Sequence, residues 1–193
     1  MDKNNNLHIT LQSKKEYIDH FSELTAPYFI EGFRSIYDKI KENNKKPKLI
    51  LKEFQEELQK IPLWSQNIIE GEYTRIKTLS NCDYLDDLIQ AVFASYSQIL
   101  LSNNNYDEID IKIPSSYHVI HTCYITIART LWKKPDLLYH RYTGEKKINI
   151  DSELYNTVLN NINLSIRNLL PFKDILNNYL EKNNENNINI INS

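Results

Sequence analysis

Apolar residues recur every three or four positions along most of this chain, a spacing that predicts a series of amphipathic helices. The clearest apolar stripe runs from Leu85 to Leu101 and is predicted to form the central helix of the core. A second stripe, over residues 117–133, is predicted to form the other core helix. Pro114 precedes it, and Ser115 or Ser116 can accept hydrogen bonds from its first amides.

Shorter stripes between prolines and polar loops predict the remaining helices. They cover residues 13–26, 27–40, 48–61, 62–79, 152–169 and 172–181. Pro27 disfavours helix at the residue before it and is expected to end or kink the first of these. Pro62 suits the first turn of a helix because it lacks the amide hydrogen that would stay unpaired there. The segment RYTGEKK is predicted to be a loop, with the next helix capped at Asp151 or Ser152.

The sum of these elements predicts an all-α fold, a compact single-domain bundle of about seven or eight helices. Isoleucines alternate with polar residues over 109–113, so one short β pairing of 109–113 with 148–150 is a secondary expectation. Residues 1–12 are predicted to be a polar N-terminal arm, 13–182 the helical domain, and 183–193 a disordered Asn-rich tail.

The composition of the chain argues against several classes of function. The chain has 193 residues, a net charge of −2 and only three glycines, and it lacks the glycine motifs of dinucleotide, phosphate-loop and hydrolase sites. We therefore expect no enzymatic activity and no cofactor. The near-neutral charge gives no reason to expect nucleic-acid binding. No apolar run reaches the 18 residues that a membrane span needs.

Two clusters suggest metal chemistry, each with a plainer alternative. His118 and His121 can share a helix face with Cys123 close by, and with His140 or Cys82 they could bind zinc. The pair is also typical of ordinary hydrogen-bonding histidines. Cys123 lies in an apolar stripe, where a thiol behaves as a small hydrophobic group. Asp83, with Asp86 and Asp87, could hold a hard cation, although capping and the helix dipole explain these residues better.

Aromatic and basic residues suggest a protein-binding surface, because Trp, Tyr and Arg dominate interfaces. The candidates are Trp64, Arg129, Trp132, Tyr139, Arg141 and Tyr142. The alternative is that Trp132 and Tyr139 fill the core while the cations are solvated. Trp64 beside a helix start is either a docking point or, with greater weight, part of the core.

Three stretches carry a family resemblance: IPLWSQNIIEGEYTRI, SNCDYLDDLIQAVFASYSQIL and HVIHTCYITIARTLWKKPDLLYHRY, together spanning roughly residues 50–142. In them the chain resembles an uncharacterised protein family of nucleocytoplasmic large DNA viruses, the mimivirus-like and alga-infecting giant viruses. The resemblance implies a virus-encoded protein made in the infected cytoplasm, and it implies no catalytic residue.

These observations lead to three functional hypotheses. The first is a non-enzymatic viral structural or protein-interaction component, such as a minor capsid or virion-assembly protein, located in the host cytoplasm or the virion. The second is a helical adaptor or modulator of a host or viral partner. The third is a metal-binding protein that uses His118, His121 and Cys123.

Overall fold

The computed structural model describes residues 3–43, 46–102 and 113–170. Over these ranges the chain forms six α-helices and two short 3-10 helices, with no strand. In order they are α1 (Lys3–Asn43), α2 (Pro47–Lys60), η1 (Ile61–Leu63), α3 (Gln66–Leu79), α4 (Leu85–Ser102), α5 (Ser116–Lys133), η2 (Pro135–Leu138) and α6 (Gly144–Asn168). The predicted all-α class is confirmed.

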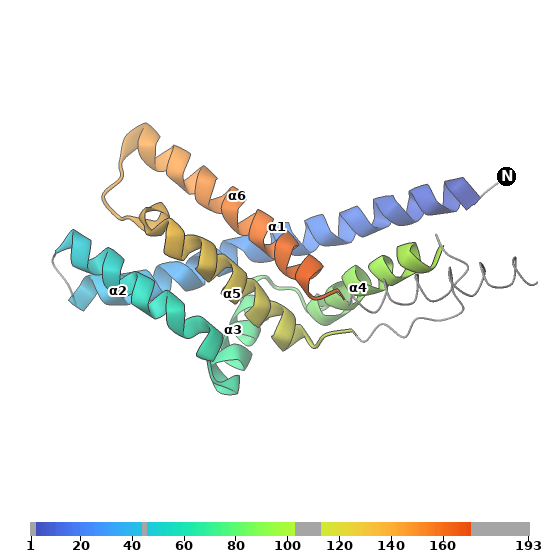
Figure 1. The fold of residues 1–193 in the computed structure, drawn as a ribbon, viewed down its shortest axis with the longest axis horizontal. Coiled ribbons are helices and arrows are strands. Elements are labelled where there is room, and N and C mark those ends of the chain that lie inside the picture. The colour runs from blue at the N-terminus through green and yellow to red at the C-terminus, as the bar shows by residue number, and fades with distance from the viewer. Residues whose placement is uncertain (1–2, 44–45, 103–112, 171–193) are drawn as a thin grey trace, which may run out of the picture.

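The long helix α1 runs along the length of the molecule, and the other helices are arranged around it (Figure 1). Its C-terminal half lies behind α2, α5 and α6, which pack side by side, while α4 packs along it towards the other end. Helix α5 packs against α2, α3 and α6, and α1 packs against α2, α3, α4 and α6. The prediction that the Leu85–Leu101 helix is central is therefore wrong, since α4 packs mainly against α1.

The apolar stripes read from the sequence face inward, as burial of apolar surface requires. In α5 the side chains of Ile120, Cys123, Ile127 and Leu131 are completely buried, and so is Val158 of α6. The start of α5 is fixed as predicted, because Ser115 Oγ accepts a hydrogen bond from the His118 amide at 3.3 Å.

The break predicted at Pro27 does not occur, because α1 continues through it to Asn43. Proline removes one backbone hydrogen bond from a helix interior, which usually kinks or breaks it. Here the neighbouring Ala26 and Phe29 are completely buried, so burial on both sides of the proline favours one continuous helix. Two predicted helices are thus one, which lowers the helix count. The helix also passes through the expected boundary at residue 12, since it begins at Lys3.

The secondary expectation of a β pairing is wrong for residues 148–150, because they lie inside α6. This helix begins at Gly144, seven residues before the predicted cap at Asp151, and absorbs most of the predicted loop. Gly144 has a φ of +57°, a conformation that glycine adopts easily. Residues 109–112, the predicted helix 172–181 and the tail 183–193 lie outside the described residues.

The connections between helices also differ in detail from the prediction. Pro62 lies in η1 rather than at the start of a helix, and α3 begins only at Gln66. Asn81 has a φ of +50°, and together with the hydrogen bond from the Cys82 amide to the Lys77 carbonyl it closes the end of α3. In the part of the chain that is described, no helix is long and apolar enough to cross a membrane.

Candidate interaction site

An apolar groove of 380 Å³ lies between α2, η1 and α5. Its lining residues are Leu58, Gln59, Pro62, Ile125, Ala128, Arg129, Trp132 and Lys133. Leu58 and Ala128 are almost fully buried and form its floor, while Trp132 is 42 % exposed. Two of the predicted interaction residues, Arg129 and Trp132, therefore lie in the same groove.

The two walls of the groove are held in register by hydrogen bonds at both ends. Gln55 Nε2 donates to the Trp132 carbonyl at 2.7 Å, and His121 Nε2 lies 2.8 Å from the Ile61 carbonyl oxygen. Because positions 55 and 61 of one wall face 132 and 121 of the other, the two walls are antiparallel. An open apolar groove between two antiparallel helices is a typical binding site for an amphipathic helix of a partner.

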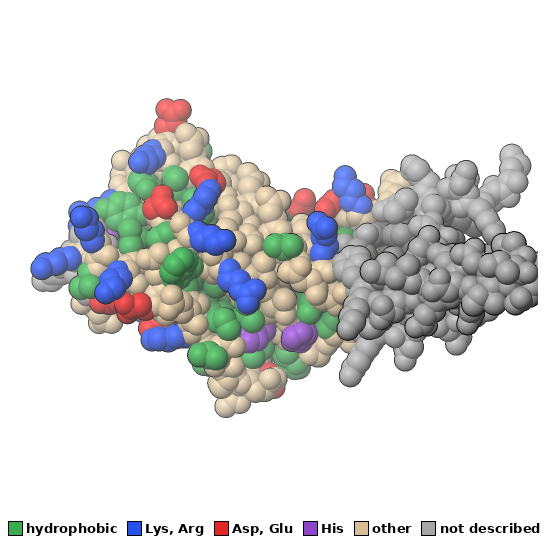
Figure 2. Space-filling view, viewed as in Figure 1, with side chains coloured by type: hydrophobic (Ala, Val, Ile, Leu, Met, Phe, Trp, Pro, Cys, Tyr) green, Lys and Arg blue, Asp and Glu red, His purple; other side chains and the backbone are tan. Residues whose placement is uncertain are grey.

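Cations flank this groove without acidic neighbours in its lining. Arg129 and Lys133 form no ion pair with any described residue, unlike Lys60 and Lys134 nearby. On the face seen in Figure 2, hydrophobic side chains and Lys and Arg side chains gather over α2 and α5, and Asp and Glu side chains also lie over α2. Leu63, next to the groove-lining Pro62, is 83 % exposed. The groove thus combines an apolar floor with a positively charged edge.

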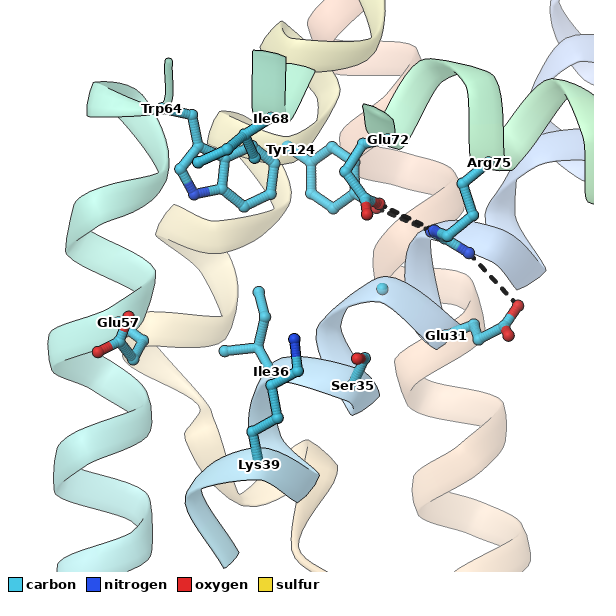
Figure 3. A pocket seen from close by; sticks show the side chains of 11 residues that line it. Glu31, Ser35, Ile36, Lys39, Glu57, Trp64, Ile68, Glu72, Arg75 and Tyr124 are labelled. Carbon is cyan, nitrogen blue, oxygen red and sulfur yellow. Dashed lines mark hydrogen bonds and ion pairs between the residues drawn. The ribbon is translucent and has the colours of Figure 1, made fainter. Parts of the chain in front are cut away.

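Trp64 lies outside this groove, at the edge of a separate cavity of 290 Å³ (Figure 3). It is half-buried, stacks on the ring of His121 with 11° between the planes, and packs on Tyr124 at 5.0 Å between centroids. It is therefore mainly a core-packing residue, which was the weightier alternative. Across the cavity lie Glu72 and Arg75 of α3 and Glu31 of α1.

A partly buried polar network, which no sequence pattern predicts, lies at the inner end of this cavity. Tyr124 donates a hydrogen bond to Glu72, and Arg75 Nη2 donates to Glu72, to the Tyr124 hydroxyl at 3.1 Å and to the Tyr28 carbonyl at 2.7 Å. Burial, with the Glu72 carboxylate beside it, raises the pKa of Tyr124 well above its usual value. The phenol therefore stays neutral and acts as a fixed donor that ties α3 to α5.

The other predicted interaction residues gather elsewhere, around η2. Tyr139 and Tyr142 meet edge to face at 5.2 Å between centroids and line a third cavity with His140. Arg141 is exposed beside them. The six candidates therefore fall into three places rather than one surface.

The structure also places the predicted metal candidates. Cys123 is completely buried, and burial raises the pKa of its thiol to about 12. His118 is exposed, whereas His121 is engaged with the Ile61 carbonyl and stacked on Trp64. Among the described residues no three His, Cys, Asp or Glu side chains are placed to hold a metal ion.

Asp86, from the predicted acidic cluster, connects neighbouring helices through hydrogen bonds. Its carboxylate accepts hydrogen bonds from Tyr73 at 2.6 Å, Lys77 at 2.7 Å and Ser116 at 2.5 Å. Partial burial raises the pKa of Asp86, but these three donors outweigh that effect and lower it to about 2. The carboxylate thus joins α3, α4 and α5, while Asp83 is exposed.

Comparison with known proteins gives one result, a match to a protein family. No curated protein and no solved structure matches it. A family model described as a family of unknown function, DUF5764, matches residues 7–139. The match contains every residue of the α2–α5 groove and stops before α6. Because it covers well over half of the 193 residues, the chain belongs to the DUF5764 family.

Proposed function

We propose that this protein works by binding another protein, and that the partner places an amphipathic helix with acidic flanks in the α2–α5 groove. The groove is the observation that carries the proposal. Its floor is apolar, its walls are antiparallel helices, and its edge carries Arg129 and Lys133 without acidic partners among the described residues. A helix with leucine-like residues on one face and Asp or Glu beside them complements both features.

Trp132 is the residue expected to contribute most to binding. It is 42 % exposed at the groove, and a tryptophan that becomes buried at the centre of an interface is the commonest kind of hot spot. Arg129 and Lys133 lie on the rim, so they are expected to affect the association rate and its salt dependence more than the lifetime of the complex.

The setting of this activity is proposed from the family resemblance described above. We propose a virus-encoded, non-enzymatic component that acts in the host cytoplasm or the virion, as a minor capsid or virion-assembly protein. The alternative is an adaptor that uses the same groove on a host or viral partner. A fixed ratio to the major capsid protein in purified particles supports the first, and presence only in infected-cell lysate supports the second.

Site-specific photocrosslinking tests the groove itself. A photoreactive amino acid replaces Gln59, which is exposed in the groove, or Asn156, which is exposed on α6 and serves as the control. In infected cells the probe at position 59 is expected to crosslink one discrete protein that the probe at 156 does not. Mapping the crosslink is expected to place it in an acidic amphipathic segment.

Two results would count against this proposal. One is the same set of crosslinked proteins from both positions. The other is a partner, once purified, that crosslinks equally well to a probe at position 59 when Trp132 has been replaced by Ala.

A further inference from the structure

A cavity of 250 Å³ at the end of the bundle, distinct from the groove, is lined by basic and aromatic side chains. It lies where the C-terminal part of α1, η2 and the first turns of α6 meet. Its lining residues are Arg34, Tyr37, Asp38, Lys41, Leu137, Leu138, Tyr139, His140, Tyr142, Lys147, Ile150 and Asp151. Three of these carry a positive charge and two a negative charge.

The cations come from two helices and are held by the two carboxylates. Arg34 Nη2 lies 2.8 Å from Asp151 Oδ1, and Lys147 Nζ lies 2.9 Å from Oδ2 of the same carboxylate. Lys41 Nζ lies 2.6 Å from Asp38 Oδ1. Each cation keeps further N–H donors after these contacts, since a guanidinium has five and an ammonium three. The carboxylates therefore position the donors without exhausting them.

The ion pairs are weak enough for an incoming anion to compete. Their side chains are between 38 % and 53 % exposed, and exposed pairs contribute only about 0–1 kcal/mol. A phosphate group carries close to two negative charges at neutral pH and accepts several charge-assisted hydrogen bonds. A single carboxylate carries only one negative charge, so phosphate can compete with it for the cations.

The uncharged wall of the cavity adds neutral polar groups and an aromatic surface. The Tyr37 hydroxyl is 2.8 Å from His140 Nδ1, and Tyr139 and Tyr142 stand edge to face beside them. The pKa of His140 lies below its usual value because of partial burial first, and then because of Lys41 and Arg141. Asp38 acts on His140 in the opposite direction, and the lining as a whole carries three positive and two negative charges.

We propose that this cavity binds a small phosphate monoester, with its phosphate on Arg34, Lys41 and Lys147 and its organic part against the tyrosines. The volume of 250 Å³ lies just below the range of about 300–1,000 Å³ that is usual for ligand pockets, so the cavity suits only a small molecule. The site lies apart from the groove, so it is independent of the function proposed above.

Titration calorimetry of the full chain tests this assignment with inorganic phosphate and phenyl phosphate as probes. Phenyl phosphate is expected to bind more tightly than inorganic phosphate because of the aromatic wall. Lys41→Met or Lys147→Met is expected to weaken both about 10-fold, with the helical circular dichroism unchanged. Lys52→Met, which removes a lysine paired with Glu56 on α2, is the matched control and is expected to change neither.

The Asp38→Asn variant distinguishes a phosphate-binding site from a cluster of charges that only stabilises the fold. It removes the carboxylate that competes for Lys41, so a phosphate site is expected to bind several-fold more tightly. Equal affinity in the wild type, Lys41→Met and Lys147→Met would overturn the proposal. So would heats no larger than those of sodium chloride at the same ionic strength, or a phenyl phosphate affinity no greater than that of inorganic phosphate.

Discussion

Gly32, in the middle of α1, offers a sharp test of how the core is packed. A Cβ added there would overlap the hydroxyl of Tyr124 and lie 2.9 Å from Arg75 Nη2. Both groups belong to the network with Glu72, so moving either of them away from an added Cβ costs hydrogen bonds. Gly32→Ala should therefore destabilise the fold, although glycine to alanine in a helix normally does the opposite.

The size of the effect follows from three contributions. Replacing Gly by Ala in a helix gains about 0.5–1 kcal/mol from the backbone. Overpacking a dense core costs about 1–3 kcal/mol, and displacing a hydrogen bond to a charged group costs about 1.5–3 kcal/mol more. The net loss expected is about 1.5–5.5 kcal/mol, which for a chain of this length lowers the melting temperature by roughly 3–20 °C.

Urea unfolding followed by circular dichroism measures this loss, with Gly71→Ala as the matched control. Gly71 also lies in a helix but has nothing within 4 Å of an added Cβ, so alanine there should stabilise by about 0.5–1 kcal/mol. In a Tyr124→Phe background, Gly32→Ala should lose about 1 kcal/mol less than in the wild type. A stabilising Gly32→Ala, or the same loss in both backgrounds, would show that the hydroxyl does not occupy the space above Gly32.

Two further predictions concern titrating groups. The pKa of Asp86 is lowered from 3.8 to about 2, so its stabilisation is present above pH 4 and is lost as the pH falls towards 2. Because its side chain is 42 % exposed, we expect the wild type to lose about 1 kcal/mol more than Asp86→Asn across that range in acid unfolding; parallel curves would contradict this. Cys82 and Cys123 are both buried, and burial raises the pKa of each thiol, so neither should react with a thiol reagent until guanidinium unfolds the chain. Rapid labelling of either cysteine in the folded protein would show that the chain around it opens locally.

Periodic burial explains why most helices could be predicted from the sequence. Helix α5 follows its apolar stripe closely, and so does the later part of α6, because local spacing alone decides which face is buried. The predictions of a helix break at Pro27 and of a loop around Gly144 were wrong because each relied on the local preference of one residue. Propensity at one residue is a weak effect, and tertiary burial around it decides whether a helix continues.

The sites were harder to predict because they depend on which helices become neighbours. The sequence predicts Arg129 and Trp132 as interaction residues, but only the packing of α5 on α2 shows that they line one groove. The network of Arg75 with Tyr124 joins positions 49 apart in sequence. One local signal was available: Gly32 is a single glycine within an apolar helical stripe, which often marks a close approach by another group.

The affinity of the partner identified by crosslinking, measured with purified wild-type and Trp132→Ala proteins, tests the groove most directly. Loss of a hot-spot tryptophan costs about 2 kcal/mol or more, so the dissociation constant should rise at least about 30-fold. Because Trp132 is 42 % exposed, more than half of it is packed on the protein, and the substitution should also lower the free energy of unfolding by about 1–3 kcal/mol. The two dissociation constants are therefore compared under conditions in which both proteins are folded. An unchanged dissociation constant in a folded Trp132→Ala protein would show that the partner binds somewhere other than the α2–α5 groove.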